Sequence, residues 1–353
     1  MAAHEGTTHA GTPHSILLLF VVLGLGIVIG SGVAVRRRLI SGRLGILGAF
    51  AGFGIGGFGG IGLVEIQVVA ATGPQLTEWY PIASLVVGSM VMLGSQVLGM
   101  IYWPRKPRYL GLGILLGVWI MYPALLPNQG VLHPLGYLLV PAIPLSIGYI
   151  LWHDARGVLR TVVSQRFPRA VGMISAVLFS VFFAFSAGTL SINPDTSAGM
   201  RTEGFVTTLP VSGPLVYWPA VEFYLPSIPL AGMVSLGTLL LFGLLGGLIG
   251  LNAAVVAVQW DGADDTASTR ALAGTLTTTG ATACCCCAPA MYGITSAIFG
   301  AAATPVYWAF MDPSSPVGGL FFAASVLLLT GSLLRATGSR GTRVNCEVPA
   351  TSS

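Results

Sequence analysis

Long apolar runs without charge recur along the chain, and they constrain its fold more than any other feature. The first is typical, because residues 15–35 contain no charged side chain and three arginines follow at once. Only 8% of the 353 residues are charged and 54% are hydrophobic, a composition that cannot cover a soluble globule. Each run is long enough to cross a bilayer as a helix, and none alternates as barrel strands do. The sequence therefore predicts an all-α, polytopic bundle of transmembrane helices, whose main partner is the lipid bilayer.

About nine spans are predicted, separated by short polar or basic connections. A basic stretch at 158–167 is expected to form a short interfacial helix. Residues 191–227, rich in proline and interfacial aromatic residues, are expected to form the longest loop. The span at 271–303 exceeds the roughly 20 residues that one straight crossing needs, which a break within it would explain. The nine predicted ranges are 15–35, 44–70, 81–102, 109–126, 135–152, 170–190, 228–259, 271–303 and 317–334.

The arginines predict how the bundle is oriented. Arginine-rich segments follow the first, third, fifth and ninth spans, and all four share one side if the N-terminus is outside. Since basic residues concentrate on the cytoplasmic side, we expect an outer N-terminus and an inner C-terminus in the inner or plasma membrane. No basic residue precedes the first apolar run, which is unlike a cleavable signal. Four segments are expected: a polar, histidine-containing tail (1–14), a seven-helix membrane region (15–269), a cysteine-rich two-helix hairpin (270–336) and a cytoplasmic tail (337–353).

Four of the five cysteines are adjacent: Cys284, Cys285, Cys286 and Cys287, here called the cysteine cluster. A disulfide between neighbours is strained, because their Cα atoms lie only about 3.8 Å apart and a bridge needs about 4.4–6.8 Å. A closed tetrahedral zinc site usually needs a second pair of cysteines from another segment, which this chain lacks. Two or three thiolates suit a soft ion such as Cu(I) or Hg(II). The alternative is ordinary packing, because cysteine is also a small hydrophobic residue.

Pro289 adds to the argument for a chemical site. Its ring clashes with the carbonyl of Cys285, four residues earlier, so a helix should kink or break there. A helical segment that begins near Pro289 would point the positive end of its dipole at the thiols and favour thiolate. Broken helices at membrane depth are tolerated where they are buried in protein or line a cavity.

The segment around these cysteines resembles the membrane hairpin of the mercuric transport proteins. In that family a helix carries small residues, a Cys-Cys pair and a nearby proline, followed by a short proline-containing outer loop and a second helix that ends in arginines. Here the order is Ala-Thr-Ala-Cys-Cys-Cys-Cys-Ala-Pro, then Pro313 and Pro316, then a helix ending at Arg335. The resemblance covers about a fifth of the chain, residues 270–335. It implies transport of a thiophilic metal, although four cysteines replace two and a large membrane region precedes the hairpin.

Other polar residues are candidate sites. Removal of Met1 would leave Ala-Ala-His4, whose amine, amides and imidazole can form a square-planar site for Cu(II) or Ni(II); the alternative is a disordered tail with incidental histidines. Glu65 and Gln67 are a polar pair in the second predicted span, and such groups either serve a function or lie solvated at the interface. Gln96 and Asn252 are expected to form hydrogen bonds between helices.

These features together predict transport or membrane transfer of Hg(II) or Cu(I) through the cysteine cluster, without enzymatic activity and without a firmly held cofactor. A transporter of this kind would have a periplasmic or extracytoplasmic metal-binding protein as partner. Two alternatives stay open: a non-transporting accessory or assembly subunit of a copper-containing respiratory complex, and a thiol–disulfide membrane protein, since Cys284 and Cys287 have Cys-x-x-Cys spacing. No phosphate loop, Gly-x-Ser-x-Gly or His-Glu-x-x-His motif occurs, and the short basic clusters do not indicate nucleic-acid binding.

Overall fold

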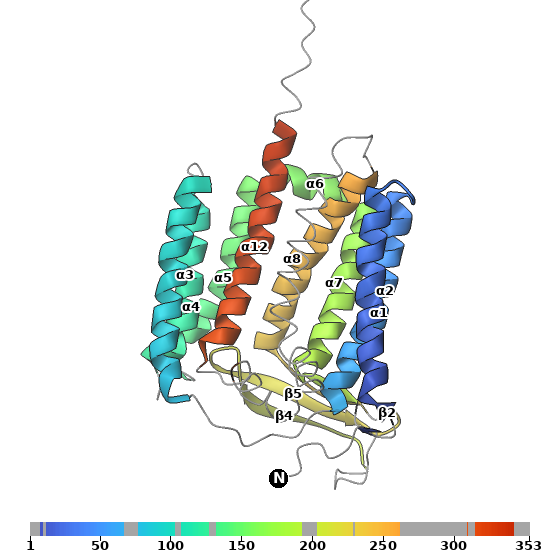
Figure 1. Ribbon diagram of the computed structural model, residues 1–353. Coiled ribbons are helices and arrows are strands. Elements are labelled where there is room, and N and C mark those ends of the chain that lie inside the picture. Colours follow the sequence, from blue (N-terminus) through green and yellow to red (C-terminus); the bar gives the residue numbers. More distant parts are fainter. Residues whose placement is uncertain are drawn as a thin grey trace, which may run out of the picture.

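The computed structural model describes residues 8–9, 12–66, 77–102, 107–126, 132–192, 203–228, 230–261, 309 and 315–341. Within these ranges eight helices are long and apolar enough to cross a membrane, and they stand side by side in one bundle (Figure 1). The chain is therefore a multi-pass helical membrane protein, as its apolar runs predict. The eight helices are α1 (His14–Arg36), α2 (Gly42–Ile66), α3 (Tyr80–Tyr102), α4 (Pro107–Leu125), α5 (Pro134–Asp154), α7 (Arg166–Ser186), α8 (Leu236–Asp261) and α12 (Pro316–Gly341).

The predicted interfacial helix is present as α6 (Arg156–Ser164). Val158 and Val162 are buried on one side of it, whereas Arg156 and Arg160 are exposed on the other. Two apolar positions four residues apart share a helix face, so the helix is amphipathic and suits a membrane surface. The predicted span at 271–303 lies outside the described residues.

The expectation of a loop at 191–227 is wrong, because these residues contribute to a four-stranded antiparallel sheet. Its strands are β3 (Leu190–Ile192), β4 (Phe205–Ser212), β5 (Tyr217–Leu225) and β6 (Leu230–Ser235), in the order β3-β6-β5-β4. In β5 the side chains of Trp218 and Ala220 are buried while Tyr217 and Val221 are exposed, the period-two pattern of a strand with one covered face. The all-α prediction therefore holds for the membrane spans but not for this sheet, and the span expected from residue 228 begins only at Leu236.

Two further short strands, β1 (Thr8–His9) and β2 (Thr12–Pro13), pair antiparallel in the predicted N-terminal tail. They precede α1 directly, so the described part of this tail lies at the same end of the bundle as the sheet (Figure 1).

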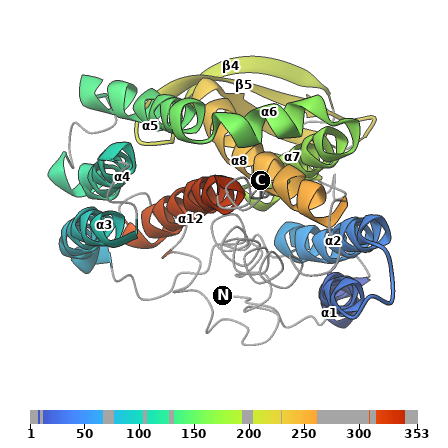
Figure 2. The same ribbon diagram turned by 90° about the horizontal axis from the view of Figure 1, so that it is seen from above.

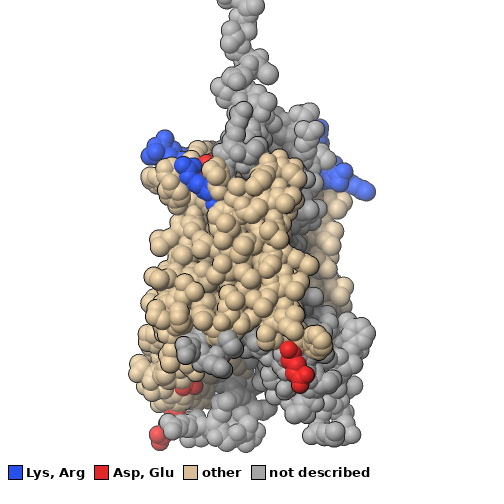
Figure 3. Space-filling view, turned by 90° about the vertical axis from the view of Figure 1, so that its left-hand side faces the viewer, with Lys and Arg blue, Asp and Glu red and all other residues tan. Residues whose placement is uncertain are grey.

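Charge divides the bundle into two unlike ends. Figure 3 shows the described basic side chains gathered at one end of the face in view, where an acidic side chain also lies beside them, and the other visible acidic side chains at the opposite end. We call them the arginine end and the sheet end. Glu78, in the short helix η1 (Thr77–Trp79), and the sheet residue Glu222 belong to the sheet end. The arginine end carries Arg36, Arg37, Arg38, Arg43, Arg108, Arg156, Arg160, Arg166, Arg169 and Arg335.

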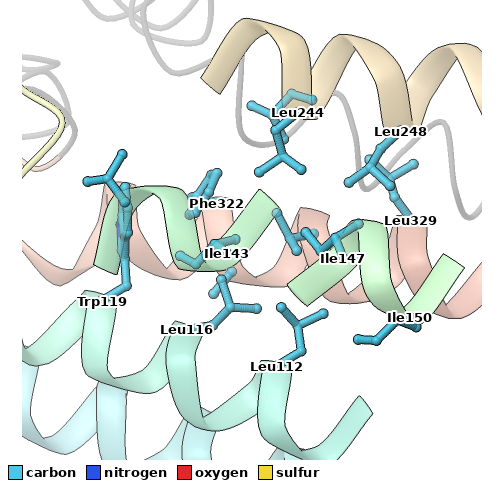
Figure 4. Close-up of a cluster of buried hydrophobic side chains, with 14 of the residues drawn as sticks. Leu112, Leu116, Trp119, Ile143, Ile147, Ile150, Leu244, Leu248, Phe322 and Leu329 are labelled. Atoms are coloured by element: carbon cyan, nitrogen blue, oxygen red, sulfur yellow. The ribbon is translucent and has the colours of Figure 1, made fainter. Parts of the chain in front are cut away.

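The C-terminal helix α12 lies at the centre of the hydrophobic core. Half of its span is buried, the largest share among the eight described spans, as expected for a helix that is apolar on nearly every side. Its Phe322 ring packs on Trp119 of α4, with ring centroids 4.9 Å apart. Figure 4 shows this core, in which α4, α5, α8 and α12 all contribute side chains. The buried side chains include Leu112, Leu116, Ile143, Ile147, Leu244, Leu248 and Leu329.

Glycines permit the closest helix contacts, as the glycine-dense second span predicts. A Cβ added to Gly24 of α1 would lie 2.3 Å from the backbone nitrogen of Gly56 on α2. Helices α7 and α8 meet in the same way, since a Cβ at Gly250 would lie 2.6 Å from the carbonyl oxygen of Gly172. No side chain fits at these positions unless the backbones separate.

Candidate functional site

The predicted site residues fall mainly in segments for which the structure gives no description. The cysteine cluster, His4 and Gln67 all lie outside the described residues. Glu65 belongs to the last turn of α2, where only its backbone is described. The Cu(II) site at His4 and the metal site of the cysteine cluster therefore stay predictions.

Contacts between α8 and α12 define the arrangement of the two helices that flank the cysteine-containing segment. Asn252 of α8 contacts Leu329 of α12. Val258 near the end of α8 belongs to the same apolar cluster as Ala336 near the end of α12. The two helices therefore run parallel, each from the sheet end to the arginine end (Figure 1). Asp261 ends α8 at the arginine end, whereas α12 begins at the sheet end. The described flanks of the cysteine-containing segment thus lie at opposite ends of the bundle.

A polar contact joins these two helices within the apolar bundle. Asn252 donates through Nδ2 to the carbonyl oxygens of Leu248, at 2.8 Å, and of Leu329, at 3.2 Å. Ser332 Oγ donates to Asn252 Oδ1. Gln96 of α3 similarly donates to the carbonyl oxygen of Leu110 on α4, at 2.9 Å. The prediction of interhelical hydrogen bonds for Gln96 and Asn252 is confirmed.

A second polar group lies at the arginine end. Asp154 Oδ1 accepts from Arg108 at 3.4 Å, and the Arg108 guanidinium lies 5.2 Å from the centroid of the Tyr149 ring. The imidazole of His153 packs edge-on against the same ring, at 4.5 Å. These contacts tie α5 to α4 where both helices leave the apolar region. Such a pairing anchors the ends of the two helices.

The described ranges contain no group of three or more His, Cys, Asp or Glu side chains that could hold a metal ion.

The described helices also form an apolar groove of about 340 Å³ between α5 and α8. Every residue that lines it is glycine, proline, leucine or isoleucine, including Pro144, Ile147, Gly148, Gly243 and Gly247. The sequence does not predict this groove, because its only local signal is the pair of glycines four residues apart on α8, a spacing common in helix packing.

Comparisons with protein-family models, with curated proteins and with solved structures found no match for this chain. The resemblance of residues 270–335 to the mercuric transport hairpin therefore stays a prediction from the sequence.

Proposed function

We propose that this protein transfers a thiophilic metal ion, Hg(II) or Cu(I), across the inner or plasma membrane, with the cysteine cluster as the binding group. The observation that carries the proposal is the cluster itself: four adjacent thiols, followed by Pro289, in a stretch without charge between Arg270 and Asp312. Soft ions prefer thiolate ligands. Scattered structural cysteines would not be expected to gather four in a row in a chain that has only one other.

The flanking helices support a position for the cluster within the membrane. The connection from Asp261 to Ser315 starts at the arginine end and finishes at the sheet end. The described ends of this connection thus lie at opposite ends of the bundle, and the cysteines lie near the middle of its sequence. We therefore propose that residues 271–303 supply the ninth span. Nine spans also agree with an N-terminus and a C-terminus on opposite sides.

The charged ends of the bundle support the direction of this topology. Every described arginine of the bundle lies at the arginine end, and basic residues favour the cytoplasmic side. The proposed arrangement has the sheet and the N-terminal tail outside and the arginine end inside. An extracytoplasmic metal-binding protein would then deliver the ion at the sheet end.

Thiolate ligation answers the main physical obstacle to metal transfer. An isolated charge is costly to bury in an apolar medium, and two thiolates cancel the charge of Hg(II). Exchange of the ion among adjacent sulfurs would move it without release into lipid. Cys286 and Cys287 lie nearest Pro289 and are proposed to accept the ion first.

A cellular uptake experiment tests this proposal. Cells that express the wild-type chain should accumulate more Hg(II) or Cu(I), measured by elemental mass spectrometry, than cells that express the protein with all four cluster cysteines replaced by serine. Cys346→Ser, which changes the one cysteine outside the cluster, is the control and should behave as wild type. Equal accumulation at equal membrane abundance would refute transport through the cluster.

A further inference from the structure

The groove between α5 and α8 lies on the side of the bundle where α6 crosses the arginine end. Figure 2 shows α6 running from the end of α5 towards the start of α7, beside α8. The groove extends from Leu239, in the first turn of α8, to Leu251 in its second half, and along α5 from Pro144 to Leu151. Both helices are membrane spans, so this groove opens within the hydrocarbon region of the bilayer.

Glycines, which have no side chain, keep the groove open. Gly243 and Gly247 on α8 and Gly148 on α5 are exposed, and a Cβ added at any of the three would meet no atom within 4 Å. The neighbouring Gly250 differs, because its space is occupied by Gly172 of α7. The α8 glycines thus serve two purposes: one set allows close contact with α7, and the other leaves a surface open.

The size of the groove favours a lipid chain over a protein helix. From Leu239 to Leu251 the helix rises about 18 Å, so the groove, with a volume of about 340 Å³, is long and narrow. A helix with side chains is about 10–12 Å wide, which is a cross-section of about 80 Å² or more. A helix of that width would lie mostly outside the groove, whereas a slender hydrocarbon chain can lie along its floor.

The arginine end of the groove has the chemistry of a headgroup site. Trp152, 58% exposed, lies one turn beyond the groove-lining Gly148, on the same face of α5. The guanidinium of Arg156 lies 4.8 Å from the centroid of the Trp152 ring, and Arg160 is exposed one turn further along α6. Neither arginine has an acidic partner in the described part of the chain. Tryptophan favours the headgroup level of a bilayer, and unpaired arginines there attract anionic lipids.

We propose that this groove binds one acyl chain of an anionic phospholipid from the leaflet at the arginine end. The phosphate lies against Arg156 and Arg160, beside Trp152, and the acyl chain follows the glycine-lined floor of α8. The proposal depends on the membrane position of the bundle and is independent of the chemistry of the cysteine cluster.

Native mass spectrometry of the full-length protein in detergent tests this site. Phosphatidylglycerol and phosphatidylcholine with identical acyl chains are titrated separately, and the wild type should bind one phosphatidylglycerol in preference. Gly247→Leu should abolish this binding by filling the groove. Gly94→Leu on α3 is the matched control, because a Cβ there also meets nothing within 4 Å but lies away from the groove. Should Gly247→Leu fail to fold, Gly148→Leu from the opposite wall gives the same test.

The headgroup half of the proposal is tested by the arginines. Arg156→Gln and Arg160→Gln should each weaken phosphatidylglycerol binding by about fivefold and leave phosphatidylcholine binding unchanged. Equal binding of the two lipids by the wild type, or unaltered binding by Gly247→Leu, would overturn the assignment. A wild-type dimer that Gly247→Leu converts to a monomer would also overturn it, because the groove would then be a contact between protein chains.

Discussion

Asn252 on α8 donates a hydrogen bond to the main-chain carbonyl oxygen of Leu329 on α12, 3.2 Å away, and accepts one from Ser332 one turn later. The two helices that carry these residues flank the segment with the cysteine cluster. In an apolar surrounding, the amide has few other partners, so this contact holds the two flanking helices in a defined register.

We predict a measurable energetic coupling between Asn252 and Ser332. Asn252→Leu and Ser332→Ala should each destabilise the protein. The double variant should lose less stability than the sum of the two single losses, because both changes break the same contact. The coupling energy should be about 0.6 kcal/mol, and at most about 1.7 kcal/mol. Thermal unfolding of detergent-solubilised protein measures this coupling energy. In the control, Ser89→Ala on α3 replaces Ser332→Ala, and its effect on stability should simply add to that of Asn252→Leu.

The two kinds of glycine on α8 predict opposite outcomes for the same substitution. Gly250→Leu should destabilise the protein by several kcal/mol or prevent folding, since its new Cβ would lie 2.6 Å from the Gly172 carbonyl oxygen and overpacking is costly. Gly247→Leu should leave the unfolding temperature nearly unchanged, because open space surrounds that position. A similar loss of stability in both variants would contradict the described packing of α7 on α8.

The positions of the described spans were predictable because each depends on local composition alone. The start of α8 was not, since β6 runs directly into it through Ser235 and Leu236 and both segments are apolar. No charge or proline marks that boundary. The alternation of buried and exposed residues in β5 appears only in the structure, because the exposed Tyr217 and Val221 are as apolar as the covered Trp218 and Ala220. The available signal in the sequence was the aromatic content of this segment.

The contacts between helices were predictable in kind but not in detail. Asn252 was expected to form a hydrogen bond across helices, yet its partner Leu329 is 77 residues away, and nothing in either segment specifies the pair. The groove shows the same limit, because α7 packs against Gly250 whereas Gly247 faces open space. That difference belongs to the tertiary arrangement and not to the local sequence.

We predict that Tyr137 of α5 anchors the sheet to the helix bundle. Its hydroxyl donates to the carbonyl oxygen of Tyr217 at 2.6 Å, and its ring packs edge-on against Trp218, with centroids 5.3 Å apart. Tyr137→Phe keeps the ring contact and loses the hydrogen bond, which should cost about 1 kcal/mol and speed proteolysis within the sheet. Tyr149→Phe is the control on the same helix, because that hydroxyl has no hydrogen bond among the described residues. Equal rates of proteolysis in the two variants would contradict an anchoring role for the Tyr137 hydroxyl.

The proposed orientation predicts the location of reporter fusions. A reporter fused after Ser353 should be active only in the cytoplasm. A reporter fused after Gly204, just before β4, should be active only outside, because the sheet lies at the end opposite to the arginines. Two reporters on the same side would mean a different number of crossings between them and would refute the nine-span arrangement.

Metal content of the purified protein tests the central proposal most directly. Wild-type protein loaded with Hg(II) or Cu(I) and then freed of excess ion should retain the metal, measured by elemental mass spectrometry as moles per mole of chain. The variant that combines Cys284→Ser, Cys285→Ser, Cys286→Ser and Cys287→Ser should retain none, whereas Cys346→Ser should match the wild type. Equal metal content in the wild type and the four-serine variant would contradict the proposal. The cysteines of the cluster would then serve only as small packing residues.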